Sequence, residues 1–380
     1  MSGRNIFIYG HRGVGKTSLA LTAANEFASK LQNVKIVCVS CDKNMSFGQI
    51  IKDIADATLQ EDPRVTKQSS AAKGSIGLSK LGLSANGEVN SMKELGTFSE
   101  PKSVNDASDI IRHISSRYKE LIIIVDEFDQ ILDKEISYMF SVLVKRIADS
   151  KISAKMIICG IGESVEDLFQ AHGSAQRYFD TERLELLKIG PLREIIDTAC
   201  DGIGIKFDET TAYRIAMISS GSPYYVHLIS EKLFNEIYYS TRDYKGNASA
   251  FFREGVNRAI EAISPLLKGN YEKAVKKYND VYEELLWALA DHHQLQRPTE
   301  EIYKSYQRIM AKRPNKEQLE RKKFSQRMNY LKRETHGRML KGTRQGWYEF
   351  KENIYRGYSR LRAEQEGIEL GSEHPLESRF

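Results

Sequence analysis

The chain has 380 residues, of which 41% are hydrophobic, and it carries a formal net charge of +5. A chain of this size can bury two or three cores, and no apolar run approaches the length of a membrane span. No N-terminal pattern predicts a signal peptide, so we expect a cytoplasmic protein with no membrane partner. Four cysteines are too few for a disulfide scaffold, and the Cys38-x-x-Cys41 spacing favours buried thiols over a metal site because no second pair accompanies it.

The first predicted strand, residues 6–9, leads directly into a G-x-x-x-x-G-K-[ST] motif, and a predicted helix at 18–30 follows. Strand, loop and helix in this order are the context that a phosphate-binding loop requires. The glycines let backbone N–H groups surround phosphates, and the helix adds the positive end of its dipole. We predict that Lys16 reaches the β- and γ-phosphates of ATP and that the Thr17 hydroxyl is a Mg²⁺ ligand. The predicted nucleotide contacts here are Gly10, Arg12, Gly13, Val14, Gly15, Lys16, Thr17 and Ser18.

Helices and strands continue to alternate as far as residue 190. We predict further strands at 35–40, 121–125, 155–161 and 184–189, and helices at 47–59, 104–117, 137–148 and 165–169. Helical crossovers between strands predict an α/β fold with a parallel, doubly wound sheet. Residues 67–102 are rich in Ser, Gly and Lys, and we interpret them as an insertion, either an exposed glycine-rich hairpin or a disordered linker.

The apolar run 121–125 ends in two carboxylates, Asp126 and Glu127. Such a run is typical of a strand buried on both faces of a parallel sheet, and ligands bind at the carboxyl ends of these strands. We therefore predict that Asp126 holds Mg²⁺ through water and that Glu127 polarises the water that attacks the γ-phosphate. Without the phosphate-binding loop, an ordinary acidic helix cap would be the better interpretation.

The pattern changes to helices alone after residue 190. Residues 191–265 contain predicted helices at 192–200, 209–218, 224–236 and 249–262, which we interpret as a lid domain on the 1–190 nucleotide-binding domain. Residues 270–372 contain predicted helices at 280–291, 299–312 and 316–334, then two strands within 339–350, and a tail at 373–380 follows. Helices followed by a β-hairpin predict a winged-helix domain.

Positive charge is concentrated in this last region. Between Lys304 and Arg344, fourteen Lys or Arg residues accompany three acids, so the segment carries +11 and the rest of the chain −6. This asymmetry is typical of a nucleic-acid-binding module, although an acidic protein partner would fit a similar surface. The side chains predicted to face the phosphates or major groove of duplex DNA are Arg321, Lys322, Lys323, Gln326, Arg327 and Lys332, with Lys341 and Arg344 in the wing.

Taken in order, these motifs resemble the AAA+ ATPases of the origin-recognition and Cdc6-like group, and more distantly the transposition-regulator and STAND signalling ATPases. The similarity covers nearly the whole chain. Its loop and acid pair are specific to P-loop ATPases in general, whereas the branch rests on the terminal module and on Gly221-Ser222-Pro223-Tyr224-Tyr225. The resemblance implies a homo-oligomer in which Arg177 reaches the γ-phosphate of a neighbour. It places a polar sensor at Glu163 or Ser164, of which Ser164 is preferred.

Two departures from the family pattern affect the expected activity. Tyr224 occupies the place of the usual lid arginine, so one stabiliser of the γ-phosphate is missing and we expect slow hydrolysis, suited to a switch. Only nine residues precede Gly10, so the segment that covers adenine in the family is shortened or the base is held differently.

Three functional hypotheses follow. The first is a DNA-associated AAA+ ATPase that serves replication initiation, a mobile element or anti-phage defence. The second is a STAND-like signalling ATPase that regulates a separately encoded effector through protein contacts. The third, a P-loop kinase, is disfavoured by the long helical and basic C-terminal region.

Overall fold

The computed structural model describes residues 5–60, 99–162, 178–240, 247–275 and 282–371. The chain divides into two compact units, one formed by residues 1–10 and 16–184 and the other by residues 11–15 and 185–380. The predicted helix at 165–169 and nearly all of the predicted insertion at 67–102 lie outside the described residues. No described helix is both long and apolar enough to cross a membrane.

The first unit is built on a five-stranded sheet with the strand order β2-β3-β4-β1-β5, and every pairing in it is parallel. Its strands are β1 (Asn5–Gly10), β2 (Val34–Ser40), β3 (Glu120–Asp126), β4 (Ala154–Gly160) and β5 (Phe179–Leu184). The apolar run 121–125 forms most of β3 and is fully buried. The predicted parallel α/β sheet is therefore confirmed.

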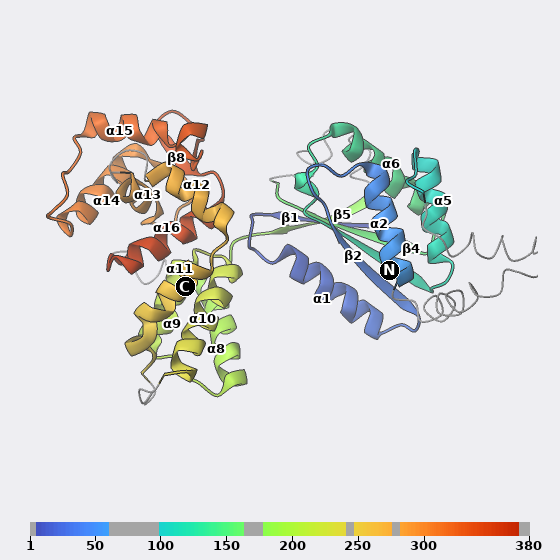
Figure 1. Ribbon diagram of the computed structural model, residues 1–380, viewed down its shortest axis with the longest axis horizontal. Helices are drawn as coiled ribbons and strands as arrows, with labels where there is room; N and C mark the ends of the chain where they lie inside the picture. The colour runs from blue at the N-terminus through green and yellow to red at the C-terminus, as the bar shows by residue number, and fades with distance from the viewer. Residues whose placement is uncertain (1–4, 61–98, 163–177, 241–246, 276–281, 372–380) are drawn as a thin grey trace, which may run out of the picture. The chain divides into compact units, whose positions relative to one another are not determined.

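Helices cover both faces of this sheet, as Figure 1 shows. They are α1 (Lys16–Ser29) on one face, and α2 (Phe47–Gln60), α5 (Val104–Ser115) and α6 (Lys134–Asp149) on the other. The smaller core contains Ala20 and Ala24, whose short side chains allow α1 to lie close to the strands. The larger core contains Phe140, which packs edge-on against Phe47 and Phe128 at centroid distances of 5.2 Å. Aromatic pairs of this geometry stabilise a core beyond simple area burial.

Two predictions for this unit are corrected. The last strand is β5 at 179–184 and not the predicted 184–189, because β5 is an edge strand whose residues 180–183 are exposed and lack an apolar run. Cys41 is buried, as expected, but Cys38 is exposed because β2 is the other edge strand.

The second unit begins with four helices where the sequence predicts a lid, and α12 follows them. Its elements are α8 (Ile189–Ile203), α9 (Glu209–Ser219), α10 (Pro223–Tyr238), α11 (Phe252–Ala262), α12 (Pro265–Val275), α13 (Glu283–Ala290), β6 (Arg297–Pro298), α14 (Thr299–Ala311), α15 (Arg321–Tyr330), β7 (Leu340–Gly342), β8 (Trp347–Phe350) and α16 (Asn353–Gln365). The predicted hairpin is present as β7 and β8, and β6 adds a third antiparallel strand in the order β6-β8-β7.

The helix predicted at 316–334 is shorter than expected. Helix α15 covers only 321–330. Pro314 is incompatible with a helix that continues from α14, and Leu319 is tied to two tyrosines instead: Tyr306 accepts from its N–H at 3.0 Å and Tyr303 donates to its carbonyl at 3.0 Å. These bonds hold the segment before α15 away from helical geometry.

Helix α16 is absent from the sequence-based prediction, and it joins the parts of the second unit. It lies between α9 and α11 on one side and α13 on the other (Figure 1). Asn353, Arg356, Ser359 and Arg360 are buried in it beside its apolar residues, so its polar side chains do not mark an exposed face. Buried side chains from Leu192 to Ile368 form one contiguous core. The boundary predicted near residues 265–270, between the lid domain and the winged-helix domain, stays a prediction.

Candidate functional site

The phosphate-binding loop connects β1 to α1, and its glycines adopt backbone angles that other residues avoid. Gly10, Gly13 and Gly15 have φ angles of 146°, 79° and 94°. At Gly10 a Cβ would lie 2.3 Å from the carbonyl oxygen of Leu184, so the backbones of β1 and β5 approach too closely for any side chain. These angles are those of a loop whose N–H groups turn toward a bound anion.

The hydroxyl of Thr17 donates a hydrogen bond of 2.6 Å to Oδ2 of Asp126 at the end of β3. The other carboxylate oxygen of Asp126 accepts from the N–H of Glu127 at 2.9 Å, and its carbonyl accepts from the N–H of Cys41 at 2.8 Å. Hydroxyl and carboxylate oxygens are ligands suited to Mg²⁺, which takes few protein groups and completes its shell with phosphates and water. No cluster of three or more His, Cys, Asp or Glu forms a metal cage in the described residues. The pair fits Mg²⁺ held mainly by a nucleotide.

Lys16 is half-buried, and its ammonium donates to the carbonyl oxygen of Gly10 at 3.2 Å. This bond folds the side chain back along the loop that precedes it. Anionic phosphate oxygens are stronger acceptors than a peptide carbonyl, so a nucleotide would compete for the same ammonium protons.

Glu127 directly follows Asp126 and is held in a left-handed conformation, with φ 53° and ψ 34°. Its side chain is exposed and forms no hydrogen bond to the short helix that starts after it. This geometry disfavours the interpretation of the acid pair as an ordinary helix cap. Left-handed backbone at a residue with a side chain is costly and is often found at functional sites.

Asp129 was not predicted as a site residue, and it fixes the end of the neighbouring strand. Its Oδ1 accepts from the N–H of Ile161, just beyond β4, at 2.7 Å. The only signal in the sequence was a third acid shortly after the Asp126 and Glu127 pair. Ser164, Glu163 and Arg177 lie outside the described residues, so the structure does not test the sensor and the arginine finger.

The turn before α10 contacts the phosphate-binding loop within the second unit. The hydroxyl of Ser222 donates to the carbonyl of Gly13 at 2.9 Å, and the N–H of Tyr224 lies 3.4 Å from the same oxygen. A Cβ on Gly13 would lie 2.8 Å from the Ser222 hydroxyl. The sequence analysis predicted that Tyr224 belongs to the nucleotide site but did not single out Ser222. The only sequence feature that pointed to Ser222 was its place in the Gly-Ser-Pro turn that starts the helix.

The remaining predicted loop contacts differ in exposure. Val14 is buried, whereas Arg12 and Ser18 are exposed. Burial raises the pKa of Tyr224, and the charge of Arg12 opposes that shift. The Tyr224 side chain therefore lies beside Gly13 of the loop, within range of the Arg12 charge.

Ion pairs neutralise much of the positive charge on α14 and on the segment after it. Glu284 is 1% exposed and binds Arg313 at 3.2 Å and Lys316 at 2.8 Å, and Asp291 pairs with Arg308. Buried pairs of this kind fix the position of both partners. These cations are therefore engaged inside the module.

Fewer of the cations of α15 and the hairpin are paired with carboxylates, although Arg321 donates to the carbonyl of Thr299 at 2.7 Å. Arg321, Lys322, Lys323 and Arg344 are exposed, and Arg327, Lys332 and Lys341 are half-buried. Of these seven predicted DNA contacts, Lys341 is paired with Glu349 at 2.5 Å, and in the described part of the chain no carboxylate pairs with the other six. Arg327 is the least suited to reach DNA, because it lies over the Tyr282 ring and has a buried NH1 group. Arg344 stacks on Trp347 at 3.6 Å.

Comparisons with known proteins agree with this geometry. Residues 1–152 match the family described as AAA ATPase domain, and no curated protein matches the chain. The Walker-type ATPase paby2304 of Pyrococcus abyssi is 14% identical over 94% of this chain and 90% of its own, with a TM-score of 0.51. Cdc6p of Pyrobaculum aerophilum is 13% identical over 95% of this chain and 88% of its own, with a TM-score of 0.42. ORC1 of Aeropyrum pernix in complex with DNA is 15% identical over 96% of this chain and 87% of its own, with a TM-score of 0.43. The predicted P-loop ATPase fold is thereby confirmed.

Proposed function

From the AAA ATPase domain of residues 1–152, we propose that this chain is an ATP-hydrolysing switch of the origin-recognition and Cdc6-like type that binds duplex DNA. The observation that carries the nucleotide assignment is the 2.6 Å bond between Thr17 and Asp126. It joins the end of the phosphate-binding loop to the carboxyl end of the buried strand β3, which is where P-loop enzymes hold Mg²⁺ and phosphates.

The chemistry is assigned to a small set of side chains. Lys16 binds the β- and γ-phosphates, and Thr17 and Asp126 hold Mg²⁺, which neutralises charge on the transferred phosphoryl group when bound. The exposed carboxylate of Glu127 orients and polarises the attacking water. Because Tyr224 stands in place of the lid arginine, we expect turnover to be slow.

A continuous set of contacts connects the phosphate-binding loop to α16. The turn that bonds Gly13 through Ser222 also holds Ser220, whose carbonyl accepts from Asn353 at 3.1 Å and whose hydroxyl accepts from Arg356 at 2.7 Å. The next residues of α10 add a bond of 2.6 Å from the Tyr225 hydroxyl to the carbonyl of Ile354. A nucleotide that reshapes the loop would thus act on the helix that packs against the C-terminal module.

The C-terminal module has the element order of a winged helix. Helices α13, α14 and α15 precede the β7-β8 hairpin, and β6 completes the small sheet. In this assignment α15 enters the major groove and the hairpin is the wing. Exposed Lys322 and Lys323 on α15 and Arg344 in the hairpin supply phosphate contacts, which dominate affinity for DNA.

The test uses the Glu127→Gln protein, which should hold ATP without turning it over. We expect it to bind a labelled duplex more tightly in ATP than in ADP, with an affinity that falls steeply as salt rises. Lys322→Ala combined with Lys323→Ala should weaken binding and reduce the slope of log K against log salt by about one per lost phosphate contact. The control Lys206→Ala removes an exposed lysine elsewhere in the second unit and should change neither quantity.

Absence of DNA binding in both nucleotide states would contradict the DNA assignment. The cationic face of α15 would then be a protein-docking surface, as the signalling hypothesis requires, and the search would turn to effector proteins. ATP binding by Lys16→Ala at native affinity would contradict the nucleotide site itself.

Self-association is part of the same proposal. We expect ATP to promote a homo-oligomer in which Arg177 of one subunit completes the site of its neighbour. Arg177→Ala should then retain ATP binding but lose hydrolysis and ATP-dependent assembly, measured by analytical ultracentrifugation. A monomer in ATP at every concentration would contradict this part.

A further inference from the structure

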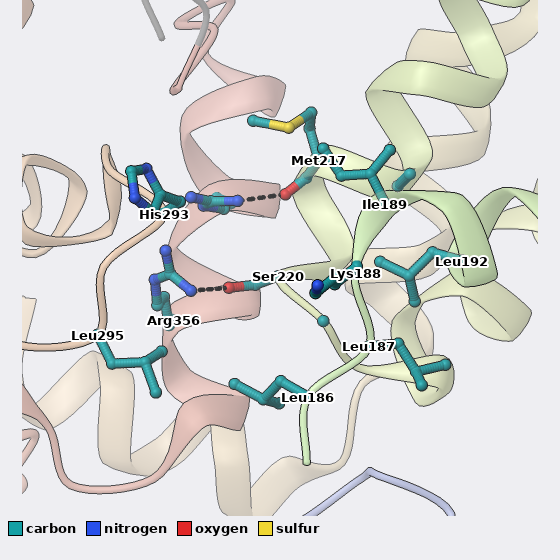
Figure 2. Close-up of a pocket in the computed structure, with 13 residues that line it drawn as sticks. Leu186, Leu187, Lys188, Ile189, Leu192, Met217, Ser220, His293, Leu295 and Arg356 are labelled. Atoms are coloured by element: carbon teal, nitrogen blue, oxygen red, sulfur yellow. Dashed lines mark hydrogen bonds between the residues drawn. The ribbon is translucent and has the colours of Figure 1, made fainter. Parts of the chain in front are cut away.

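A cavity of about 380 Å³ lies within the second unit (Figure 2). Its walls come from the segment after β5 and the start of α8, from α9 and the turn that follows it, from the segment after α13, and from α16. Cavities of this volume accept small organic molecules. Apolar side chains form most of the lining, chiefly Leu186, Leu187, Ile189, Leu192, Met217 and Leu295.

The wall formed by α16 is cationic. Arg356 and Arg360 line the cavity, although they are only 4% and 5% exposed. Arg356 donates to the Ser220 hydroxyl at 2.7 Å and to the carbonyl of His292. Arg360 donates to the carbonyls of Ala290 at 2.8 Å, His292 at 3.0 Å and Met217. Figure 2 shows Arg356 and Ser220 at one wall and Leu187 and Leu192 at the opposite one.

All of these acceptors are neutral. In the described part of the chain no carboxylate pairs with either guanidinium, and Nε of Arg356 is buried with no hydrogen-bond partner. Burial lowers the pKa of Arg356 well below its usual value and that of Arg360 to about 10, so each guanidinium is less stable as a cation here than in water. A buried charge without a counter-charge is disfavoured, and a bound anion would offset that cost.

Lys188 adds a third positive charge to the lining. Its side chain is exposed, so it lies at the solvent side of the cavity, unlike the two arginines. The arrangement combines a deep cationic wall, an apolar wall and a basic residue that solvent reaches. This combination matches a ligand with a negative group and an apolar body.

We propose that this cavity binds a small amphiphilic anion, with its carboxylate or phosphate against Arg356 and its apolar body against Leu187 and Leu192. The site is separate from the phosphate-binding loop and from the DNA-binding face of α15. It would also touch Ser220, which belongs to the turn before α10.

The test titrates the full chain with 8-anilino-1-naphthalenesulfonate, an aromatic anion that fluoresces in apolar surroundings. We expect saturable binding at one site. Lys188→Glu should weaken it roughly tenfold, which corresponds to about 1.4 kcal/mol. Leu295→Trp should abolish it by filling the cavity from a half-buried position, so the core is not disturbed. The control Lys206→Glu makes the same charge reversal at an exposed lysine outside the lining and should leave the affinity unchanged.

Competition identifies the ligand class and gives a second way to overturn the proposal. Displacement of the probe by octanoate indicates a carboxylate ligand, and displacement by thymidine monophosphate indicates a phosphate. Displacement by neither compound would overturn the proposal. Displacement by MgATP in the native protein but not in Lys16→Ala would also overturn it, because the cavity would then be part of the nucleotide site. Equal loss in Lys206→Glu and Lys188→Glu would show that the probe senses only net charge.

Discussion

The left-handed backbone of Glu127 predicts that this position lowers the stability of the folded protein. The conformation, φ 53° and ψ 34°, costs a residue with a Cβ about 1–2 kcal/mol. Glycine avoids that cost but loses about 0.5–1 kcal/mol of its own through greater freedom in the unfolded chain. We therefore expect Glu127→Gly to be more stable than Glu127→Gln by about 0.5–1 kcal/mol. Both variants should lose ATP hydrolysis by about 100-fold or more, because neither can polarise water.

The assay must report on the first unit. Both tryptophans, Trp287 and Trp347, lie in the second unit, so we would follow native-state hydrogen exchange of the β3 amides. Lys151 is a matched control, because it is exposed and has a φ of 50° at the end of α6, away from the predicted catalytic residues. Lys151→Gly should gain the same stability over Lys151→Gln while hydrolysis is unchanged. If the gain appears at Lys151 but Glu127→Gly is less stable than Glu127→Gln, the strain argument at Glu127 is refuted.

Three further predictions follow from single contacts. Gly13→Ala should weaken binding of a fluorescent ATP analogue about tenfold or more, a loss of about 1.4 kcal/mol in binding free energy. The reason is that the alanine Cβ would lie 2.8 Å from the Ser222 hydroxyl, at a backbone φ of 79°. Binding at native affinity would show that the loop tolerates a side chain. Glu284→Gln should lower the free energy of unfolding of the second unit by about 3 kcal/mol, because Arg313 and Lys316 lose a buried partner. The exposed pair of Lys304 and Glu300 is its control, and Lys304→Ala should cost less than about 1 kcal/mol by urea unfolding monitored through tryptophan fluorescence. Burial raises the pKa of the Cys41 thiol from 9.0 to about 12, so the folded state favours the protonated thiol. The stability that this thiol contributes is therefore lost as pH rises from 9 toward 12. If iodoacetamide at pH 8 alkylated Cys41 as fast in the folded chain as in the unfolded chain, the prediction would be contradicted.

Much of the nucleotide-binding unit could be predicted from sequence because its chemistry is carried by contiguous residues. The phosphate-binding loop is eight successive residues between a strand and a helix, and the two carboxylates proposed for the site directly follow an unbroken apolar run. Backbone N–H groups and a helix dipole act over a few residues, so their pattern is visible without a fold. The edge strand β5 was misplaced because it has no apolar run of its own and is defined by pairing with β1.

The contacts that make a site out of these motifs depend on tertiary structure. Thr17 meets Asp126 across 109 positions of sequence, and Ser222 meets Gly13 across 209. Helix α16 was not predicted because buried arginines stand among its apolar residues. The charge of Arg360, for example, is solvated by the carbonyl groups of Ala290 and His292, which are distant in sequence. Periodicity reports hydrophobic burial, but it does not report burial of a polar side chain that finds its partners only when the chain has folded. The sequence alone therefore predicts the nucleotide chemistry proposed for this protein, whereas tertiary packing decided which segments surround the loop and where the cavity proposed for a second ligand lies.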